Sequence, residues 1–467
     1  MRRFLLVFIL VLMVAKVAAV IARGPSPLVM DAASYWQLGE SVADGDWLLN
    51  QEPIAYRTPL YPWFVAGIRS MFDRALFPLL LIQGLLWLGT IGLVAWMAMK
   101  WTGDRRNFWL VLAGSIPMVS SVTYVSAVLT ETLFVFLLIA HLAATMHLGQ
   151  RPAVGSGVLA GVTLGAAVLT RPIAMLLWVP GLFYLLLIWY ALPHERGAPC
   201  RKRGWTSVLV GAIVCVAMVT PWVLRNQAMF GKPFVTEFVG RNIWIVAFQD
   251  GSGAGLELPD SDAAASLKEA IGVNWESLNQ SGDWRATWSV SNALTEAGVD
   301  DATADQMMKS VALEALTSDK QTAAWKAARR CVNFWRTRAT EVPAQVADLD
   351  PAPEEREKWF AGEATWGVKV APIDTALRFR ASNSLFANTL LMLGIAAGTI
   401  LLTRWRKTRA GALWFGSVLL YFGTVTGLLE IPAYRYRMVV EPLMLLVLVA
   451  AFSPFLFRKP PDNRPHE

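Results

Sequence analysis

The stretch FLLVFILVLMVAKVAAVIARGPSPLVMD, residues 4–31, joins a long apolar run to a single carboxylate. A helix of about 20 apolar residues crosses the roughly 30 Å hydrocarbon core of a bilayer. Residues 4–22 form such a run, and Lys16, toward its outer part, is their only charged side chain. The stretch therefore predicts a membrane span, with Asp31 lying where the chain leaves the lipid.

Similar runs recur along the chain, which has 467 residues, 55% of them hydrophobic and 16% charged. Soluble domains usually carry about 25% charged residues. We therefore predict an all-α polytopic membrane protein with about ten transmembrane helices. The predicted spans are 4–22, 75–99, 107–123, 129–148, 153–170, 173–190, 205–223, 385–403, 411–429 and 438–457.

The positive charges indicate how these spans are oriented. A net charge of +7 and a pI of about 9.4 are compatible with nucleic-acid binding, but the basic residues form short clusters between apolar runs. Such clusters follow the positive-inside rule, so we expect no nucleic-acid partner and place both termini in the cytoplasm. The expected inner clusters are Arg2 and Arg3, Arg105 and Arg106, Arg151, residues 201–203, residues 404–409, and Arg458 with Lys459.

The first span also resembles a secretory signal, because it follows MRR and ends in small residues at 18–24. We favour an uncleaved anchor, since the apolar run is longer than the apolar region of a usual signal peptide. Cleavage would leave the orientation of the other spans unchanged.

Two segments are expected outside the cytoplasm. The first, 23–74, carries Asp31, and the second, 224–384, combines a polar glycine-rich loop with amphipathic helical spacing. The chain thus divides into an N-terminal transmembrane module at 1–223, a small and mostly helical extracytoplasmic domain at 224–384, and C-terminal transmembrane helices with a cytoplasmic tail at 385–467.

Histidine and cysteine exclude several kinds of site at the outer face. None of the four histidines is expected there, which disfavours Ser-His-Asp catalysis and histidine-rich zinc sites. The predicted topology separates the three cysteines, so no disulfide framework is expected. These residues are His141, His147, His194 and His466, and Cys200, Cys215 and Cys331.

Charged side chains at the outer ends of separate spans are the candidates for chemistry. They are Asp31, Arg57, Glu131, Arg171, Arg225, Arg435 and Arg437. Each has a structural interpretation: Asp31 as a helix N-cap, the arginines as snorkelling side chains, and Arg437 as the partner of Glu441 four residues on. Together, several outer arginines oppose the orientation bias and indicate an anionic partner outside.

A lipid phosphate in the outer leaflet is such a partner. Guanidinium groups bind phosphate oxygens in a bidentate manner and stay charged at all relevant pH values. A carboxylate beside them can act as a general base. The set therefore indicates transfer of a group from a lipid phosphate, with the arginines stabilising charge on the departing phosphate.

Six motifs in order resemble bacterial GT-C glycosyltransferases, in the branch similar to protein O-mannosyltransferases and lipid A aminoarabinose transferases. The resemblance is clearest over residues 1–245 and 410–457. The motifs are MDAASYWQLGESVADGDW (30–47), YRTPLYPWFVAG (56–67), TETLFVFLL (130–138), GVTLGAAVLTRP (161–172), TPWVLRNQAMFG (220–231) and YRYRMVVEPLMLL (434–446).

The resemblance implies a bacterial inner-membrane enzyme with its active site on the periplasmic side. It implies inverting transfer of a sugar from a polyprenyl-phosphate donor to an envelope glycan, lipid or protein acceptor, with Asp31 as the base. It assigns the donor phosphate or sugar to Arg57, Tyr61, Glu131, Arg171, Arg225, Arg435 and Arg437. Tyr35 and Tyr56 are sugar contacts or interface anchors.

One departure from the family pattern concerns metal binding. Mannosyltransferases of this type often carry two adjacent acids in the first loop, whereas Ala32 follows Asp31 here. We expect no metal site and no obligatory cofactor, and the sequence leaves the role of a divalent cation open.

Two other functions stay open at this stage. A transporter or flippase of lipid-linked glycans usually has charged or broken helices near the midplane, where this sequence has little charge. A glycan polymerase or ligase would use a polyprenyl-pyrophosphate donor. The sequence names neither the sugar nor the acceptor.

Overall fold

The computed structural model describes residues 2–51, 53–72, 75–191, 201–250, 256–338 and 368–456. Within these ranges every regular element is a helix, which confirms the predicted all-α class. Five residues named above lie outside the described residues: His194, Cys200, Arg458, Lys459 and His466.

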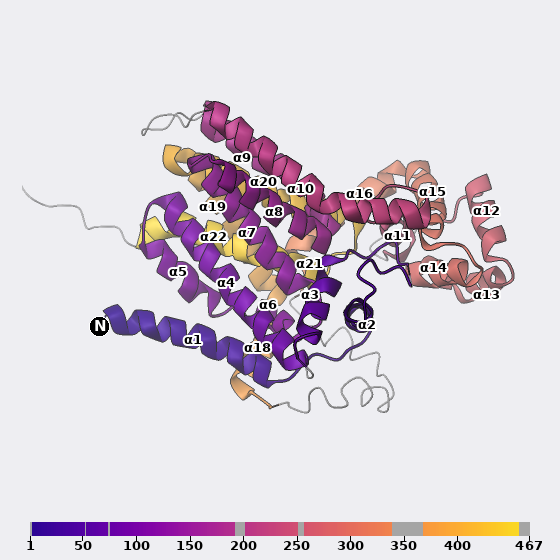
Figure 1. Ribbon diagram of the computed structural model, residues 1–467, viewed down its shortest axis with the longest axis horizontal. Coiled ribbons are helices and arrows are strands. Elements are labelled where there is room, and N and C mark those ends of the chain that lie inside the picture. The colour runs from indigo at the N-terminus through magenta and orange to yellow at the C-terminus, as the bar shows by residue number, and fades with distance from the viewer. Residues whose placement is uncertain are drawn as a thin grey trace, which may run out of the picture.

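Eight helices in the described part of the chain are long and apolar enough to cross a membrane. Figure 1 shows most of them gathered in one bundle, with α1 along its edge. They are α1 (Arg2–Ala22), α4 (Leu76–Thr102), α7 (Glu131–Gln150), the stretch Pro172–Ala191 that contains α9 (Trp178–Leu186), α10 (Arg201–Phe230), α19 (Ser384–Arg404), α20 (Arg406–Leu429), and the stretch Tyr434–Leu456 that contains α21 (Tyr434–Arg437) and α22 (Glu441–Leu456).

The expected number of about ten spans is not reached, for two local reasons. The predicted span 107–123 is a bent pair, α5 (Arg106–Ser115) followed by Val119–Ser126, which meet at 74°. Pro117 lies in the break and cannot donate a backbone hydrogen bond. The second exception is α8 (Val154–Thr170), an apolar helix of only 17 residues.

Lys16 stabilises the break between the two helices of the bent pair. Its ammonium donates to the carbonyl of Ser115 at 2.7 Å and to that of Ile116 at 3.3 Å, and it lies 4.3 Å from the ring centre of Trp87. The last carbonyls of a helix have no partner within the helix. The lysine therefore satisfies the end of α5, which accounts for a charge inside an apolar span.

Close contact between α8 and α10 depends on glycine. A Cβ at Gly157 would lie 2.1 Å from the carbonyl oxygen of Ser207, and a Cβ at Gly161 would lie 2.2 Å from that of Gly211. In lipid, where hydrophobic burial does not drive helices together, small residues allow this close backbone contact. Side chains such as Leu209 on α10 are left facing outward.

A second apolar core forms outside the bundle, at the right of Figure 1. Trp244, Leu267, Val290 and Met308 are buried in it. Its helices are α11 (Val239–Trp244), α12 (Asp262–Ile271), α13 (Asn274–Ser281), α14 (Thr287–Glu296) and α15 (Asp301–Ser318).

Two helices of the predicted segment 224–384 pack on the bundle instead. They are α16 (Lys320–Arg336) and α18 (Ala371–Ser382), whose Phe334 and Leu377 belong to the main core. At the other end of that segment, α10 runs on to Phe230. The second core is therefore smaller than the segment that was expected to form a domain.

Two short helices lie within the first loop between spans. They are α2 (Asp31–Ala43) and α3 (Leu60–Arg69), and they lie between the bundle and the second core in Figure 1. Gly39 lets them touch, because a Cβ there would lie 2.5 Å from Cγ1 of Val65. This packing places Asp31, at the start of α2, beside the segment that leads into α3.

Replacing Gly161 by alanine tests the packing of α8 on α10. The added Cβ meets backbone that cannot move aside, and overpacking of this kind costs about 1–3 kcal/mol. We expect a lower thermal unfolding midpoint in detergent, measured by circular dichroism. Gly155→Ala is the matched control, because a Cβ at Gly155 has no neighbour within 4 Å. Equal loss in both variants would contradict the close approach.

Candidate active site

Asp31 is held between two arginines. Its Oδ1 accepts from Nη2 of Arg57 at 2.7 Å, and its Oδ2 accepts from Nη1 of Arg435 at 2.9 Å. Asp31 is the first residue of α2, and the residue in the N-cap position is Met30, which has no capping side-chain bond. The carboxylate therefore serves two guanidinium groups, one of them 404 residues away, instead of capping its own helix.

Glu131 extends this arrangement into the bundle. Its fully buried carboxylate accepts, through Oε1, from Nε of Arg435 at 3.0 Å and pairs with Nη1 of Arg171 at 2.9 Å. Ion pairs thus run without a break from Arg57 through Asp31, Arg435 and Glu131 to Arg171. We call these five residues the charge cluster. Three arginines and two acids give it a net charge of +1.

The residue before Asp31 has an unusual backbone conformation. Met30 has φ 49° and ψ −121°, in a region that L-residues with a Cβ rarely adopt. Such conformations cost of order 1–3 kcal/mol and persist where the surrounding structure fixes them. The next residue, Asp31, is held by its two ion pairs at the start of α2.

The charges around Asp31 control its protonation. Burial by itself raises the pKa of this carboxyl, but the charges of Arg57 and Arg435, and the hydrogen bonds they donate, outweigh it. The pKa of Asp31 therefore lies well below its ordinary value, and the group is ionised throughout the neutral range.

Glu430, at the end of α20, is an acid beside the cluster that the sequence analysis did not select. It directly follows the apolar run 411–429, so its position at the end of a predicted span could have identified it as a candidate. Burial raises the pKa of Glu430, while Arg435 and Arg171 are near enough to lower it. The opposite shifts of Asp31 and Glu430 place two carboxyl groups of different proton affinity near one arginine, Arg435.

The three predicted tyrosines differ in their surroundings. The guanidinium of Arg57 lies 4.5 Å from the ring centre of Tyr35 and 5.1 Å from that of Tyr56. Tyr61 is fully buried, and its hydroxyl bonds to Oε1 of Gln83 at 3.1 Å. Tyr35 and Tyr56 therefore flank Arg57, whereas Tyr61 anchors α3 to α4.

The segment before Arg57 is bound to the second core. The backbone N–H of Ala55 donates to Oδ2 of Asp301 at 2.7 Å, and its carbonyl accepts from the N–H of Glu237 at 2.9 Å. Asp301 in turn pairs with the buried Arg241. Residues from α11 and α15 therefore position the loop that carries Arg57, which no local sequence pattern indicates.

The structure places Arg225 outside the charge cluster. Its Nε donates to the carbonyl of Leu48 at 2.9 Å, and its Nη2 donates to the carbonyl of Leu49. Leu49 has φ 53°, a left-handed conformation that is uncommon for leucine. Arg225 thus fixes the first loop from the end of α10.

Arg437 also lies outside the cluster. It is fully buried, and its Nη1 pairs with Oε1 of Glu441 at 3.0 Å, one helical turn away. The hydroxyl of Tyr434 donates to the other oxygen of Glu441 at 2.9 Å. Arg437 and Glu441 therefore form the ion pair between residues four apart that the sequence spacing allowed.

Among the described residues, no group of three His, Cys, Asp or Glu side chains is arranged to hold a metal ion.

A comparison with protein-family models finds no match, and neither does a comparison with curated proteins. Among solved structures, the chain is similar to the archaeal oligosaccharyltransferase AglB from Archaeoglobus fulgidus, in complex with an inhibitory peptide and a dolichol-phosphate, with 11% identity and a TM-score of 0.47. That match covers 96% of this chain and 50% of the other, so this chain spans about half of that protein.

The chain is also similar to ArnT from Cupriavidus metallidurans bound to undecaprenyl phosphate. That match has 16% identity and a TM-score of 0.38, and it covers 97% of this chain and 78% of the other. Similarity at this level leaves the function to be argued from the site itself.

Removing the Glu131 charge tests the cluster. In Glu131→Gln, Arg171 and Arg435 lose a fully buried partner, and breaking such a pair costs about 3–5 kcal/mol. We expect a clear fall in the unfolding midpoint in detergent. The control is Glu40→Gln, because Glu40 is 53% exposed and its pair with Arg69 is of the surface kind, worth about 0–1 kcal/mol. Similar shifts for both variants would show that Glu131 is not an essential partner.

Proposed function

We propose that this chain is a membrane glycosyltransferase that moves a sugar from a polyprenyl-phosphate donor to an acceptor hydroxyl, with inversion at the anomeric carbon. The observation that supports it is the carboxylate of Asp31 held between Arg57 and Arg435. A base and a surplus of guanidinium groups in one place are what this transfer requires.

The position of the cluster supports a site at the membrane boundary. Glu131 is the first residue of α7, Arg171 directly follows α8, and Arg435 lies at the start of α21. All three therefore lie at helix ends, not midway along a span. The distribution of basic residues supports an outer, periplasmic location for this end of the bundle.

Donor binding would activate the base. A carboxylate with a low pKa is a weak base, and Asp31 is weak because two guanidinium groups face it. The donor phosphate competes for Arg57 and Arg435, so Asp31 loses positive charge from its surroundings and its proton affinity rises. Asp31 would thus become an effective base only when the donor is bound.

The transfer then follows from these positions. The acceptor oxygen attacks the anomeric carbon from the side opposite the phosphate, and its proton passes to Asp31. The bond between that carbon and the phosphate oxygen breaks, and its electron pair stays on the phosphate. Arg57, Arg171 and Arg435 stabilise the charge that the phosphate gains.

Much of the donor affinity would come from the lipid. Burial of the prenyl chain contributes about 0.8 kcal/mol for each CH₂ group. The second core, which binds the backbone of Ala55 through Asp301, would cover the site and select the acceptor. Selection of the acceptor would then depend on elements that also position Arg57.

Replacing Asp31 by asparagine tests the base. General-base catalysis contributes about 10²–10⁴-fold, so we expect Asp31→Asn to lose that factor in sugar transfer from a polyprenyl-phosphate sugar in proteoliposomes, measured by mass spectrometry of the acceptor. Asp44→Asn is the control, since Asp44 lies exposed at the other end of α2. Wild-type turnover by Asp31→Asn would exclude Asp31 as the base.

Arg57→Lys tests the guanidinium. Lysine keeps the charge but not the planar fork, and a hydrogen bond to a charged group is worth about 1.5–3 kcal/mol. We expect kcat/KM for the donor to fall by roughly 10–100-fold, while Arg69→Lys, at the far end of the same loop, has little effect. An unchanged kcat/KM in Arg57→Lys would remove Arg57 from the donor site.

The lipid product distinguishes the proposed transferase from a polymerase or ligase and from a flippase. The proposed reaction releases a polyprenyl monophosphate, whereas a polymerase or ligase would release a pyrophosphate. A flippase would move labelled lipid across the bilayer without an acceptor and without cleavage. Analysis of the lipid after incubation, by phosphorus NMR, distinguishes the three.

A further inference from the structure

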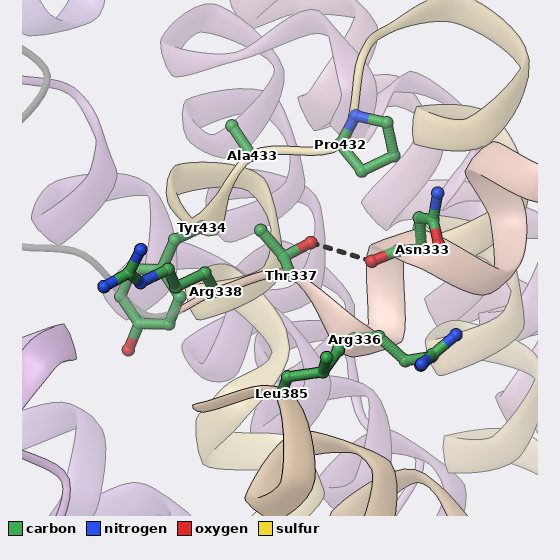
Figure 2. Close-up of a pocket in the computed structure, with 8 residues that line it drawn as sticks. All are labelled: Asn333, Arg336, Thr337, Arg338, Leu385, Pro432, Ala433 and Tyr434. Carbon is green, nitrogen blue, oxygen red and sulfur yellow. Dashed lines mark hydrogen bonds between the residues drawn. The ribbon is translucent and has the colours of Figure 1, made fainter. Parts of the chain in front are cut away.

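A pocket of about 490 Å³ lies beside the charge cluster without including any of its residues. Figure 2 shows its lining, which comes from the end of α16, the start of α19 and the segment that leads into α21. Tyr434 lines the pocket and directly precedes Arg435. The pocket and the cluster are therefore neighbours on one side of the bundle.

Two arginines give the pocket its charge. Arg336 and Arg338 both line it, on either side of Thr337. The Nε of Arg336 donates to Oγ1 of Thr389 at 3.4 Å, and among the described residues neither guanidinium has an acidic partner. Within the described part of the chain, the pocket therefore carries two positive charges that no ion pair offsets.

The two walls of the pocket that come from α16 and α19 contain no acidic residue. Residues 331–338 and 375–404, which supply the α16 and α19 walls, contain no Asp or Glu. Arg378 and Arg380 on α18 lie within the second of these stretches. The pocket also lies at the start of α19, a helix of 21 residues, whose positive end favours an anion.

A buried asparagine fixes the backbone between the two arginines. The Nδ2 of Asn388 donates to the carbonyl of Thr337, and its Oδ1 accepts from Nη2 of Arg380. Asn388 is fully buried. The chain that carries Arg336 and Arg338 is therefore attached to α19, which reduces the entropy lost when they bind a ligand.

An apolar face leads along α19 away from the pocket. Phe386 is 70% exposed, and Leu390 and Leu393, one and two turns further on, are 53% and 56% exposed. In a candidate span, such a face lies against hydrocarbon. A lipid chain along this face would bring its headgroup to the two guanidinium groups.

We propose that the pocket formed by Arg336, Thr337, Arg338, Leu385 and Tyr434 binds the phosphate of a membrane lipid whose hydrocarbon chain lies along α19. The ligand is a lipid phosphate and not free phosphate, because the arginines and the apolar face adjoin. This site is distinct from the charge cluster and does not depend on the proposed transfer. A second lipid phosphate would then lie next to Arg435.

Binding of farnesyl phosphate to the purified full chain in neutral detergent tests this site. Native mass spectrometry would measure its affinity and stoichiometry, with farnesol and inorganic phosphate as comparison probes. We expect Arg336→Gln/Arg338→Gln to weaken binding at this site at least tenfold. The matched control, Arg406→Gln/Lys407→Gln, removes the same charge at the start of α20, directly after the far end of α19, and should bind like the wild type.

The same comparison in an Arg57→Gln background separates this site from the charge cluster. We expect that background to retain the binding that depends on Arg336 and Arg338, whether or not the cluster binds a donor. If the double variant fails to fold, Leu385→Glu places an acid in the pocket at a half-exposed position and should abolish the same binding.

Three results would overturn the assignment. Undiminished binding of farnesyl phosphate by the folded double variant, or by Leu385→Glu, would exclude the pocket. Equal affinity for farnesol would exclude phosphate recognition. Equal affinity for inorganic phosphate would show an anion site without a lipid requirement.

Discussion

Buried charge needs a partner, and in this protein that requirement brings distant parts of the chain to one point. Glu131 has no access to solvent, and its carboxylate forms ion pairs with Arg171 and Arg435. Arg435 also bonds to Asp31, which bonds to Arg57. An unpaired ion at such a position costs several kcal/mol, so the buried Glu131 holds Arg171 and Arg435 beside it. The ion pairs thus connect the first loop, two helices of the bundle and the segment before α22.

The second core extends this constraint beyond the bundle. Asp301 joins Arg241, buried in that core, to the backbone of Ala55, two residues before Arg57. Arg225 fixes another part of the same loop through the carbonyls of Leu48 and Leu49. The second core and α10 therefore both bind the first loop. Together they position Arg57, the arginine of that loop that faces Asp31. A residue in either region can affect the site without touching a substrate.

Much of the fold followed from hydrophobic runs, but the helix count did not. The all-α class and the approximate spans agree with the structure, because about 20 apolar residues have one stable conformation in lipid. The segment 107–123 was predicted as one span, and it is bent because Pro117 and the capping of Ser115 by Lys16 end a helix there. Hydropathy does not register either effect. The size of the second core was likewise not predictable, because Phe334 and Leu377 have the spacing of any amphipathic helix.

The sequence showed which charged side chains lie at the ends of spans, but it did not show which of them contact one another. Charges at span ends identified Asp31, Arg57, Glu131, Arg171 and Arg435 as candidates, and they selected Arg225 and Arg437 on equal grounds. Only the tertiary structure joined the first five and left Arg225 on loop carbonyls and Arg437 on Glu441. The reason is physical: an arginine at a helix end carries the same charge whatever it meets, and its partner is decided by which helices pack together. The sequence by itself determined a helical membrane chain with charges at the ends of its spans, and packing alone decided which of those charges meet.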